Sequence, residues 1–181
     1  MELKILDWIQ ALHNPVTDVL FVWITRLGNV GMIWILLAAV LLLRRKTRKT
    51  GDILAAALVV DVLLCNGLLK HLFHRVRPCD VNTAVSLLVS RPTDYSFPSG
   101  HTAASFAAVA ALYLAGARRL WKPALVLGML IAFSRLYLYV HYPTDILGGI
   151  AVGLLSGYMG YRMVKKVYEL REKNIHMRRQ I

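Results

Sequence analysis

Two histidines of this sequence each have neighbours suited to phosphate chemistry. His101 follows Ser99 and Gly100 in a Pro-Ser-Gly-His segment that precedes an apolar run. The free amides of a helix's first turn bind anions, and a glycine lets a ligand approach the backbone. His141 lies four residues before Asp145, and a carboxylate can hold one ring nitrogen while the other acts as a nucleophile. The sequence therefore predicts two imidazoles beside an anion site.

Three cations accompany these histidines. Lys70 and Arg77 flank the expected end of one apolar segment, and Arg135 lies inside another, six residues before His141. Arginine presents a planar fork that matches phosphate oxygens, and lysine supplies a point charge. Taken singly, Lys70 and Arg77 could snorkel to a membrane surface, and Ser99 could be a plain helix cap. His141 could be an interfacial histidine, and Asp145 a carboxylate that favours the helix dipole. Arg135 is different, because a charge within an apolar run is costly and indicates function. Together these residues predict phosphoryl transfer.

The composition is typical of a membrane protein. Hydrophobic residues make up 57% of the 181 residues, whereas soluble domains use roughly 45–50% even with glycine included. This excludes a disordered, a collagen-like and a disulfide-stapled chain. Cys65 and Cys79 lie in unlike surroundings, which favours free thiols over a bridge or a zinc site.

Five apolar segments predict an all-α bundle of about five transmembrane helices, each near the lower length limit of a span. They are Gly28–Leu43, Ile53–Leu69, Thr102–Ala117, Pro123–Val140 and Ile146–Val164. Residues 1–27 are expected to form two amphipathic helices in the membrane interface, the second starting at Asn14-Pro15. The alternative is one long, tilted span over Val19–Leu43, which Arg26, Gly28 and Asn29 would interrupt. Small residues at Gly149, Gly153 and Gly157 predict close packing of the last span against the third.

The positive charges predict the orientation of the bundle. The formal net charge is +12, and 15 of the 22 Lys and Arg residues follow the first, third and fifth apolar segments. The positive-inside rule makes that side cytoplasmic, together with the helical tail over residues 165–181. The residues that could bind phosphate are then expected on the outer face. The excess of cations thus indicates membrane topology and not nucleic-acid binding.

Read together, three segments resemble the signature of the type-2 phosphatidic acid phosphatase superfamily. The pattern is Lys-x6-Arg-Pro, then Pro-Ser-Gly-His, then Ser-Arg-x5-His-x3-Asp, and every position is filled between Lys70 and Asp145. The resemblance implies a helical fold with a core of the motif-bearing helices. In size and spans the chain is similar to the bacterial integral-membrane lipid phosphatases of that superfamily, many of which have one span more.

The resemblance also implies a role for each residue of the signature. His141 is then the nucleophile that forms a phosphohistidine, Asp145 holds its other ring nitrogen, and His101 is the general acid and afterwards the base. The residues expected to bind phosphate are Lys70, Arg77, Ser99, Gly100 and Arg135. Because three fixed cations would take the place of Mg²⁺, we expect a metal-independent phosphatase without a cofactor.

Residues outside the signature carry weaker expectations. His71 and His74 are expected to pack at the interface, and Arg75 and Arg91 either to widen the anion field or to be solvated. Asp61 and Asn66 are expected to hydrogen-bond a neighbouring helix. The apolar stretch Val81–Ser90 could form a lid over the site.

The sequence therefore predicts one membrane-embedded domain over residues 1–181 that removes a terminal phosphate from a lipid. Undecaprenyl pyrophosphate is favoured by analogy, with phosphatidylglycerol phosphate and phosphatidic acid as alternatives. A non-catalytic anion-binding or transport protein would need the cations but not the His–His–Asp set. The vanadate-dependent haloperoxidases of the same superfamily are soluble and much larger. The expected partners are membrane lipids, not nucleic acid.

Overall fold

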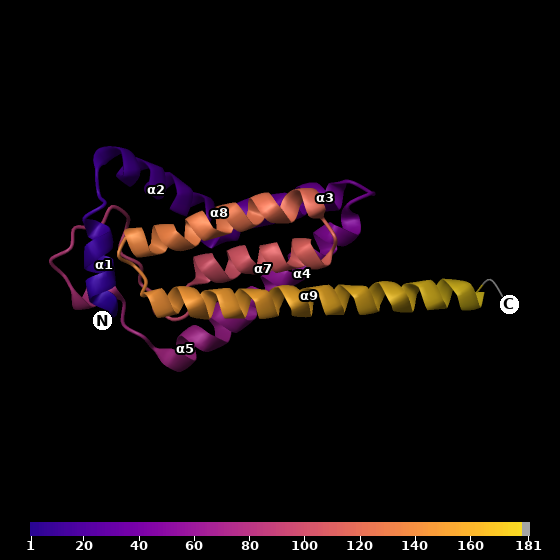
Figure 1. The fold of residues 1–181 in the computed structure, drawn as a ribbon. Coiled ribbons are helices and arrows are strands. Elements are labelled where there is room, and N and C mark those ends of the chain that lie inside the picture. The colour runs from indigo at the N-terminus through magenta and orange to yellow at the C-terminus, as the bar shows by residue number, and fades with distance from the viewer. Residues whose placement is uncertain (179–181) are drawn as a thin grey trace.

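The computed structural model describes residues 1–178, and every regular element in that range is helical (Figure 1). The elements in chain order are α1 (Glu2–Gln10), α2 (Pro15–Leu27), the 3₁₀ turn η1 (Asn29–Gly31), α3 (Met32–Leu43), α4 (Arg48–Asp61), the π-helical η2 (Val62–Leu69), α5 (Lys70–Phe73), α6 (Pro78–Val81), α7 (Gly100–Leu114), α8 (Arg118–Tyr137) and α9 (Pro143–Arg178). The all-α prediction is confirmed. The five apolar segments fall, in order, mainly on η1–α3, α4–η2, α7, α8 and α9.

By length and hydropathy, the described residues contain two helices able to cross a membrane, Arg48–Val81 and Arg118–Tyr137. A third is counted if α2 and the helix Asn29–Leu43, which meet at a bend of 46°, form one span. The bend shows that Val19–Leu43 is not one continuous helix. The number of five spans stays a prediction.

The start of α2 is where the sequence predicts it. Asn14 lies in the cap position, and its Oδ1 accepts hydrogen bonds from the backbone N–H groups of Val16 and Thr17. Pro15 takes the first helical position, where its missing N–H has no intrahelical partner to lose. The prediction of a helix boundary at Asn14-Pro15 is confirmed.

Helices α1 and α2 turn polar side chains toward the protein. The hydroxyl of Tyr139 donates to Asp7 on α1, and the hydroxyl of Tyr137 donates to Asp18 on α2, both at 2.6 Å. Trp8, in contrast, is 69% exposed. Polar contacts therefore join both helices to the end of α8 and the segment that follows it. Leu6 and Ile9 of α1 are buried in an apolar cluster at the same place, whereas Trp8 points away from the protein.

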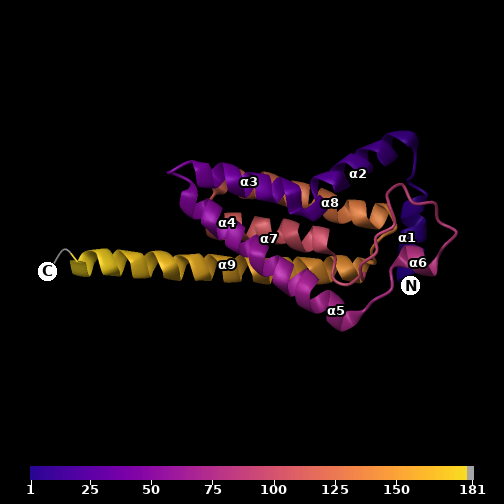
Figure 2. The ribbon, with the colours of Figure 1, turned by 180° about the vertical axis from the view of Figure 1, so that it is seen from behind.

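Helix α7 lies at the centre of the bundle, where it contacts α4, α8 and α9 (Figures 1 and 2). A Cβ added to Gly153 of α9 would lie 2.4 Å from the carbonyl oxygen of Ala103. One added to Gly157 would lie 2.8 Å from that of Ala107. The predicted small-residue packing is confirmed. In lipid, such close van der Waals contact holds helices together, because burial from water contributes little there.

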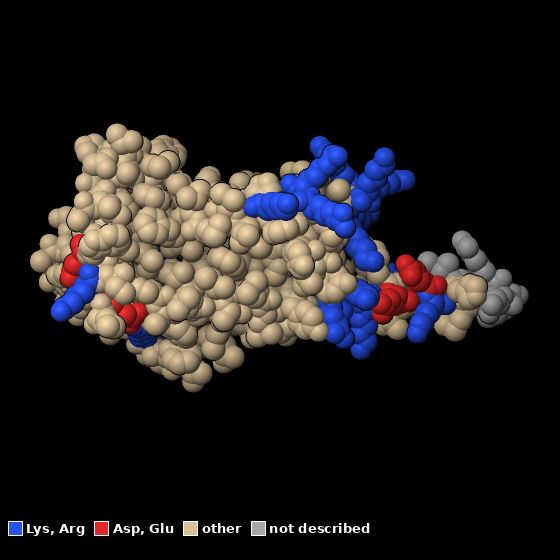
Figure 3. Space-filling model, in the orientation of Figure 1, with Lys and Arg blue, Asp and Glu red and all other residues tan. Residues whose placement is uncertain are grey.

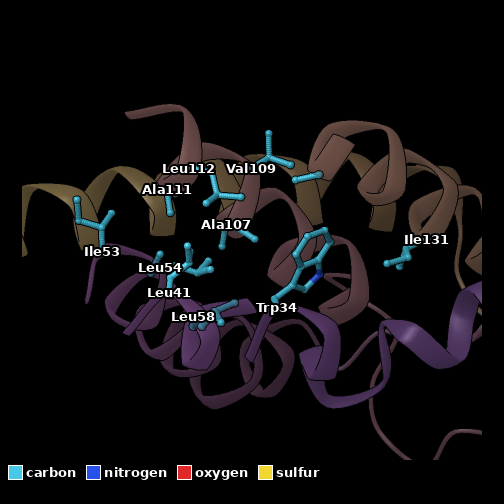
Figure 4. Packing of buried hydrophobic residues seen from close by; sticks show 14 residues of the cluster. Trp34, Leu41, Ile53, Leu54, Leu58, Ala107, Val109, Ala111, Leu112 and Ile131 are labelled. Atoms are coloured by element: carbon cyan, nitrogen blue, oxygen red, sulfur yellow. The ribbon is translucent and has the colours of Figure 1, made fainter. Parts of the chain in front are cut away.

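A buried cluster joins α7 to three neighbouring helices (Figure 4). Trp34 from α3, Leu58 from α4 and Ile131 from α8 belong to this cluster together with Leu112 of α7. The indole Nε1 of Trp34 also donates to Ser105 Oγ at 3.1 Å. A buried indole N–H needs such a partner, so this bond fixes how α3 lies against α7.

Lys and Arg residues gather at one end of the bundle (Figure 3). They come from the α3–α4 turn, the start of α8 and the protruding part of α9, which reaches Arg178 as one helix. The predicted helical tail over 165–181 is thus helical to Arg178, and residues 179–181 lie outside the described range. Three basic segments that are distant in sequence are close in space, as the topology argument expects.

Candidate active site

A cavity of about 840 Å³ lies near the first turn of α7, at the end of the bundle away from the basic cluster. Six predicted site residues line it: Lys70, Arg77, Gly100, His101, Arg135 and His141. They come from three sequence segments, each of which ends or begins a helix here. The structure therefore places the motif segments at one end of the bundle, as predicted.

Local structure brings these side chains to the cavity. Lys70 opens α5 directly after the π-helical η2, and such wide turns are frequent at functional sites. Arg77 precedes α6, and His101 lies in the first turn of α7. Arg135 belongs to the last turn of α8, so its charge lies near the helix end and away from the apolar middle.

The three cations are buried. Lys70 is 7% exposed, Arg77 3% and Arg135 5%. The alternative that Lys70 and Arg77 snorkel to the membrane surface is therefore wrong. Buried charges are costly unless they are paired and hydrogen-bonded. The hydrogen-bond partners of these three cations therefore indicate which groups the site can bind.

Arg135 keeps one donor free for a ligand. Its Nη1 donates to Thr25 on α2. Its Nε is buried and has no hydrogen-bond partner among the residues that the structure describes. Buried donors without partners are rare in native proteins, so this N–H of a cavity-lining residue indicates an acceptor oxygen that the described residues do not supply.

The contacts of His141 define its tautomer. Arg77 Nη1 lies 3.1 Å from His141 Nε2, and because a guanidinium can only donate, Nε2 must carry the lone pair. The proton is then on Nδ1, which lies 3.4 Å from Asp145 Oδ2. Burial, joined by the charges of Arg77 and Arg135 and opposed by the hydrogen bond to Asp145, lowers the pKa of His141 to about 3. The ring is neutral, with a lone pair facing the cations.

Asp145 is held from several sides. Its Oδ2 accepts from the Ser96 hydroxyl and from the backbone N–H of Tyr142, and its Oδ1 accepts from Arg75 Nη1 at 2.6 Å. Arg75 also pairs with Glu2 of α1 at 2.6 Å. Arg75 therefore binds Asp145. It is paired and does not line the cavity, so neither the expected solvated charge nor the expected widening of the anion field describes it. Sequence reasoning did not find Ser96 or Glu2, which no motif marks.

The bend between α2 and α3 packs against the side chain of His101. Its Nε2 donates to Asn29 Oδ1 at 3.0 Å, and a Cβ added to Gly28 would lie 2.8 Å from the imidazole. The sequence marks Gly28 and Asn29 only as interruptions of a span. In the structure, Gly28 is small enough for close approach and Asn29 accepts a hydrogen bond, so this segment orients the imidazole of His101.

Ser99 and Asp145 are close to the cavity but are not among its lining residues. Ser99 occupies the cap position of α7, yet its side chain caps no amide. It is fully buried, and its Oγ accepts from Thr102 at 3.0 Å. Gly100 does line the cavity, and a Cβ there would lie 3.8 Å from Lys70 Nζ.

Asp94 is a further contact of the cations that the signature does not include. Lys70 Nζ donates to its Oδ2, and Arg77 Nη2 donates to its Oδ1 at 2.7 Å. Burial alone would raise a carboxyl pKa, but hydrogen bonds and charge from Lys70 and Arg77 hold the pKa of Asp94 well below its usual range. A carboxylate therefore bridges two of the predicted phosphate ligands.

The remaining expectations have mixed outcomes. Leu87, Leu88, Val89 and Ser90 line the cavity, so part of the expected lid covers it. The side chains of His71 and His74 lie against Tyr95. Arg91 lines the cavity, where it pairs with Asp80 at 2.9 Å.

Asp61 lines the cavity, and its Oδ1 has no partner among the described residues, so the expected bond from this oxygen to a neighbouring helix is absent. Within residues 1–178, no group of three or more His, Cys, Asp or Glu side chains could hold a metal ion.

Comparisons with known proteins show the family of the chain. The family model described as the PAP2 superfamily matches residues 50–169. The chain is 33% identical over 151 residues to the undecaprenyl-diphosphatase BcrC of Bacillus subtilis. The aligned region covers 83% of this chain and 76% of the relative.

Two crystal structures are also similar. Aquifex aeolicus LpxE superposes with a TM-score of 0.76 at 28% identity, covering 89% of this chain and 94% of that one. The PAP2-type phosphatidylglycerolphosphate phosphatase of Bacillus subtilis superposes with a TM-score of 0.71 at 28% identity, covering 93% of this chain and 84% of that one. The family match includes all three motif segments, and it confirms the resemblance read from the sequence. The chain belongs to the PAP2 superfamily, and it is a hydrolase that acts on phosphate esters.

Proposed function

We propose that the chain is a membrane lipid phosphatase that removes a terminal phosphate through a phosphohistidine on His141. One observation carries the proposal: the lone pair of a neutral, buried imidazole faces a cavity lined by three buried cations. A non-catalytic anion-binding protein would need Lys70, Arg77 and Arg135 but no imidazole whose tautomer is set by a carboxylate.

The shape of the cavity supports a lipid as the substrate. An apolar groove of about 360 Å³ lies between α3 and α4–η2, and it shares Ile35, Leu58 and Val62 with the wall of the cavity. The groove faces outward through the side of the bundle, where large apolar side chains are exposed. A phosphate in the cavity can therefore have its hydrocarbon chain in the groove.

In the first step, His141 Nε2 attacks the terminal phosphorus and the bond to the leaving oxygen breaks. Asp145 holds Nδ1–H and stabilises the charge that the ring acquires. Lys70, Arg77 and Arg135 stabilise the phosphoryl oxygens in the transition state, and Arg135 Nε supplies the free donor. His101 donates a proton to the leaving oxygen, because a bound dianion favours the charged imidazole.

In the second step, His101 takes a proton from water and the hydroxide attacks phosphohistidine phosphorus. The P–N bond breaks, inorganic phosphate leaves, and His141 is neutral again. Ser99 and the backbone amides near Gly100, at the start of α7, help to bind the phosphoryl oxygens. The chain acts without a metal ion, since fixed cations supply the charge that Mg²⁺ supplies in other phosphoryl-transfer enzymes.

Undecaprenyl pyrophosphate is the substrate that we favour. The relative with 33% identity is named an undecaprenyl-diphosphatase, and a polyprenyl chain is an occupant suited to the apolar groove. The similarity to a phosphatidylglycerolphosphate phosphatase structure favours a second candidate, phosphatidylglycerol phosphate.

The chain forms one membrane domain over residues 1–181 with five spans and with α1 and α2 in the interface. The exposure of Trp8 and Trp23, 69% and 61%, supports that placement of α1 and α2. In this proposal the basic cluster and the C-terminus are cytoplasmic by the positive-inside rule, and the cavity is then on the outer face of the cell membrane.

The test is phosphate release by the purified protein from undecaprenyl pyrophosphate, phosphatidylglycerol phosphate and phosphatidic acid. We expect the highest kcat/KM for undecaprenyl pyrophosphate, and no measurable release by His141→Ala. His71→Ala is the matched control, because His71 does not line the cavity. Release by His141→Ala at the rate of the control would exclude His141 as the nucleophile, and the absence of release from every lipid would refute the function.

A further inference from the structure

The two cations that the proposed function assigns to phosphate already bind a carboxylate. Oδ2 of Asp94 accepts from Lys70, and Oδ1 accepts from Arg77. One carboxylate thus bridges a lysine and an arginine as two oxygens of a phosphate would. Within residues 1–178, the ion pairs of Lys70 and Arg77 are formed with Asp94 alone.

Asp94 can leave this position, whereas the cations cannot follow it. Its side chain is 52% exposed, but that of Lys70 is 8% and that of Arg77 is 3% exposed. Asp94 belongs to the long non-helical segment between α6 and α7, which lines the cavity. Arg77, in contrast, is also bound to the backbone carbonyl of Val140 at 2.7 Å. Arg77 Nε also donates to the backbone carbonyl of Asp94 at 2.8 Å, so the loop stays in place. Rotation of the half-exposed Asp94 side chain is enough to move the carboxylate aside and leave the fixed cations behind.

We propose that Asp94 is an exchangeable anion of the active site: it neutralises the phosphate-binding cations at rest, yields them to the substrate phosphate, and returns to displace inorganic phosphate. The inference rests on the proposed function only in taking Lys70 and Arg77 as phosphate ligands. Being tethered, the carboxylate competes at a high effective concentration. A dianionic phosphate wins the exchange because it also engages Arg135, whose Nε is unpaired while Asp94 is bound.

The exchange has a function in turnover. Three buried cations without an anion would repel one another, and they would also retain the dianionic product. Asp94 lessens both effects, because it neutralises positive charge in the empty site and competes with inorganic phosphate for the cations. Replacing Asp94 should therefore tighten the binding of phosphate and destabilise the empty protein.

The experiment measures inorganic phosphate and vanadate binding to the purified protein by calorimetry, without any lipid substrate. If Asp94 occupies nine in ten resting sites, Asp94→Asn should bind both anions about tenfold more tightly. Its thermal midpoint should be lower than that of the wild type without phosphate, and added phosphate should raise it more. Asp52→Asn is the matched control, because Asp52 accepts a hydrogen bond from Tyr168 and does not line the cavity.

Unchanged or weaker phosphate binding by Asp94→Asn would overturn the inference, because Asp94 would then hold the cations in place and not compete for them. Asp94→Ala guards against residual hydrogen bonding by the amide, and it should show the same tightening. If either variant is too unstable alone, purification in phosphate should rescue it, and failure of that rescue counts against the inference. Because no turnover is needed, tighter binding without lipid hydrolysis would refute the proposed function and leave the exchange intact.

Discussion

Arg75→Gln should slow phosphate release without weakening substrate binding. Arg75 Nη1 lies 2.6 Å from Asp145 Oδ1, and Asp145 in turn holds Nδ1 of His141. Asp145 is fully buried, and Arg75 is 29% exposed. Without the guanidinium, Oδ1 of Asp145 loses its partner, and the carboxylate is held only through Oδ2, by Ser96 and Tyr142, so its orientation toward His141 is less fixed.

The size of the effect follows from these contacts. A hydrogen bond to a charged group contributes about 1.5–3 kcal/mol. The partial exposure of Arg75 favours the lower limit, because water can replace part of the interaction. At about 1.4 kcal/mol for each factor of ten, we expect kcat to fall about tenfold. KM should change little, since Arg75 does not line the cavity.

The assay is steady-state phosphate release from a lipid diphosphate in detergent micelles, with thermal midpoints measured in parallel. Arg162→Gln is the matched control, because Arg162 is an exposed arginine that bonds Tyr158 and does not line the cavity. Arg75→Lys should recover part of kcat, since it restores the charge but not the fork that joins Asp145 to Glu2. A kcat for Arg75→Gln equal to that of the control, or a loss confined to KM, would refute a positioning role for Arg75.

Further predictions concern packing, pH, metals and sidedness. Gly153→Leu should lower stability by about 1–3 kcal/mol through overpacking against α7, whereas Gly67→Ala, whose added Cβ has no neighbour nearer than 3.7 Å, should have little effect in the same thermal scan. Acidification from pH 7 to 5 should lower the free energy of unfolding of the wild type by about 2 kcal/mol more than that of His141→Gln. The reason is that the imidazole of the unfolded chain, with pKa 6.5, gains a proton in this range, whereas buried His141, with pKa about 3, does not. An equal dependence of stability on pH in the two proteins would contradict this. Activity should persist in excess chelator and be inhibited by vanadate; restoration by Mg²⁺ after chelation would disprove metal independence. In intact cells, a cysteine at Thr93 should react with a membrane-impermeant thiol reagent and one at Thr47 only after lysis, and the reverse pattern would place the cavity inside.

The helices and the meeting of the motif segments could be predicted because each leaves a local signal. Apolar runs mark the helices, and Asn14-Pro15 marks a helix start. The glycines of α9 recur at a helical spacing, so their shared face could be read directly. Charged and imidazole side chains at the ends of such segments must then lie at the ends of the bundle.

Contacts between the motif segments and the rest of the chain could not be predicted in the same way. The bond from His101 to Asn29 joins residues 72 positions apart, and it depends on a bend at Gly28 that the sequence marks only as an interruption. Asp94 reaches the cations from a long loop, where no periodicity constrains a side chain. Burial of Lys70 was equally hidden, because a lysine at a helix end looks the same whether it faces lipid headgroups or a cavity.

The most direct test of the account is to trap the enzyme during turnover. Wild-type protein is mixed with undecaprenyl pyrophosphate labelled in its terminal phosphate, quenched in alkali within one turnover, digested and mapped by mass spectrometry. The account predicts an alkali-stable, acid-labile phosphoryl group on His141 that decays as inorganic phosphate appears, and none in His141→Ala. Lipid hydrolysis without phosphorylated His141 at any time, or label on another residue, would contradict it.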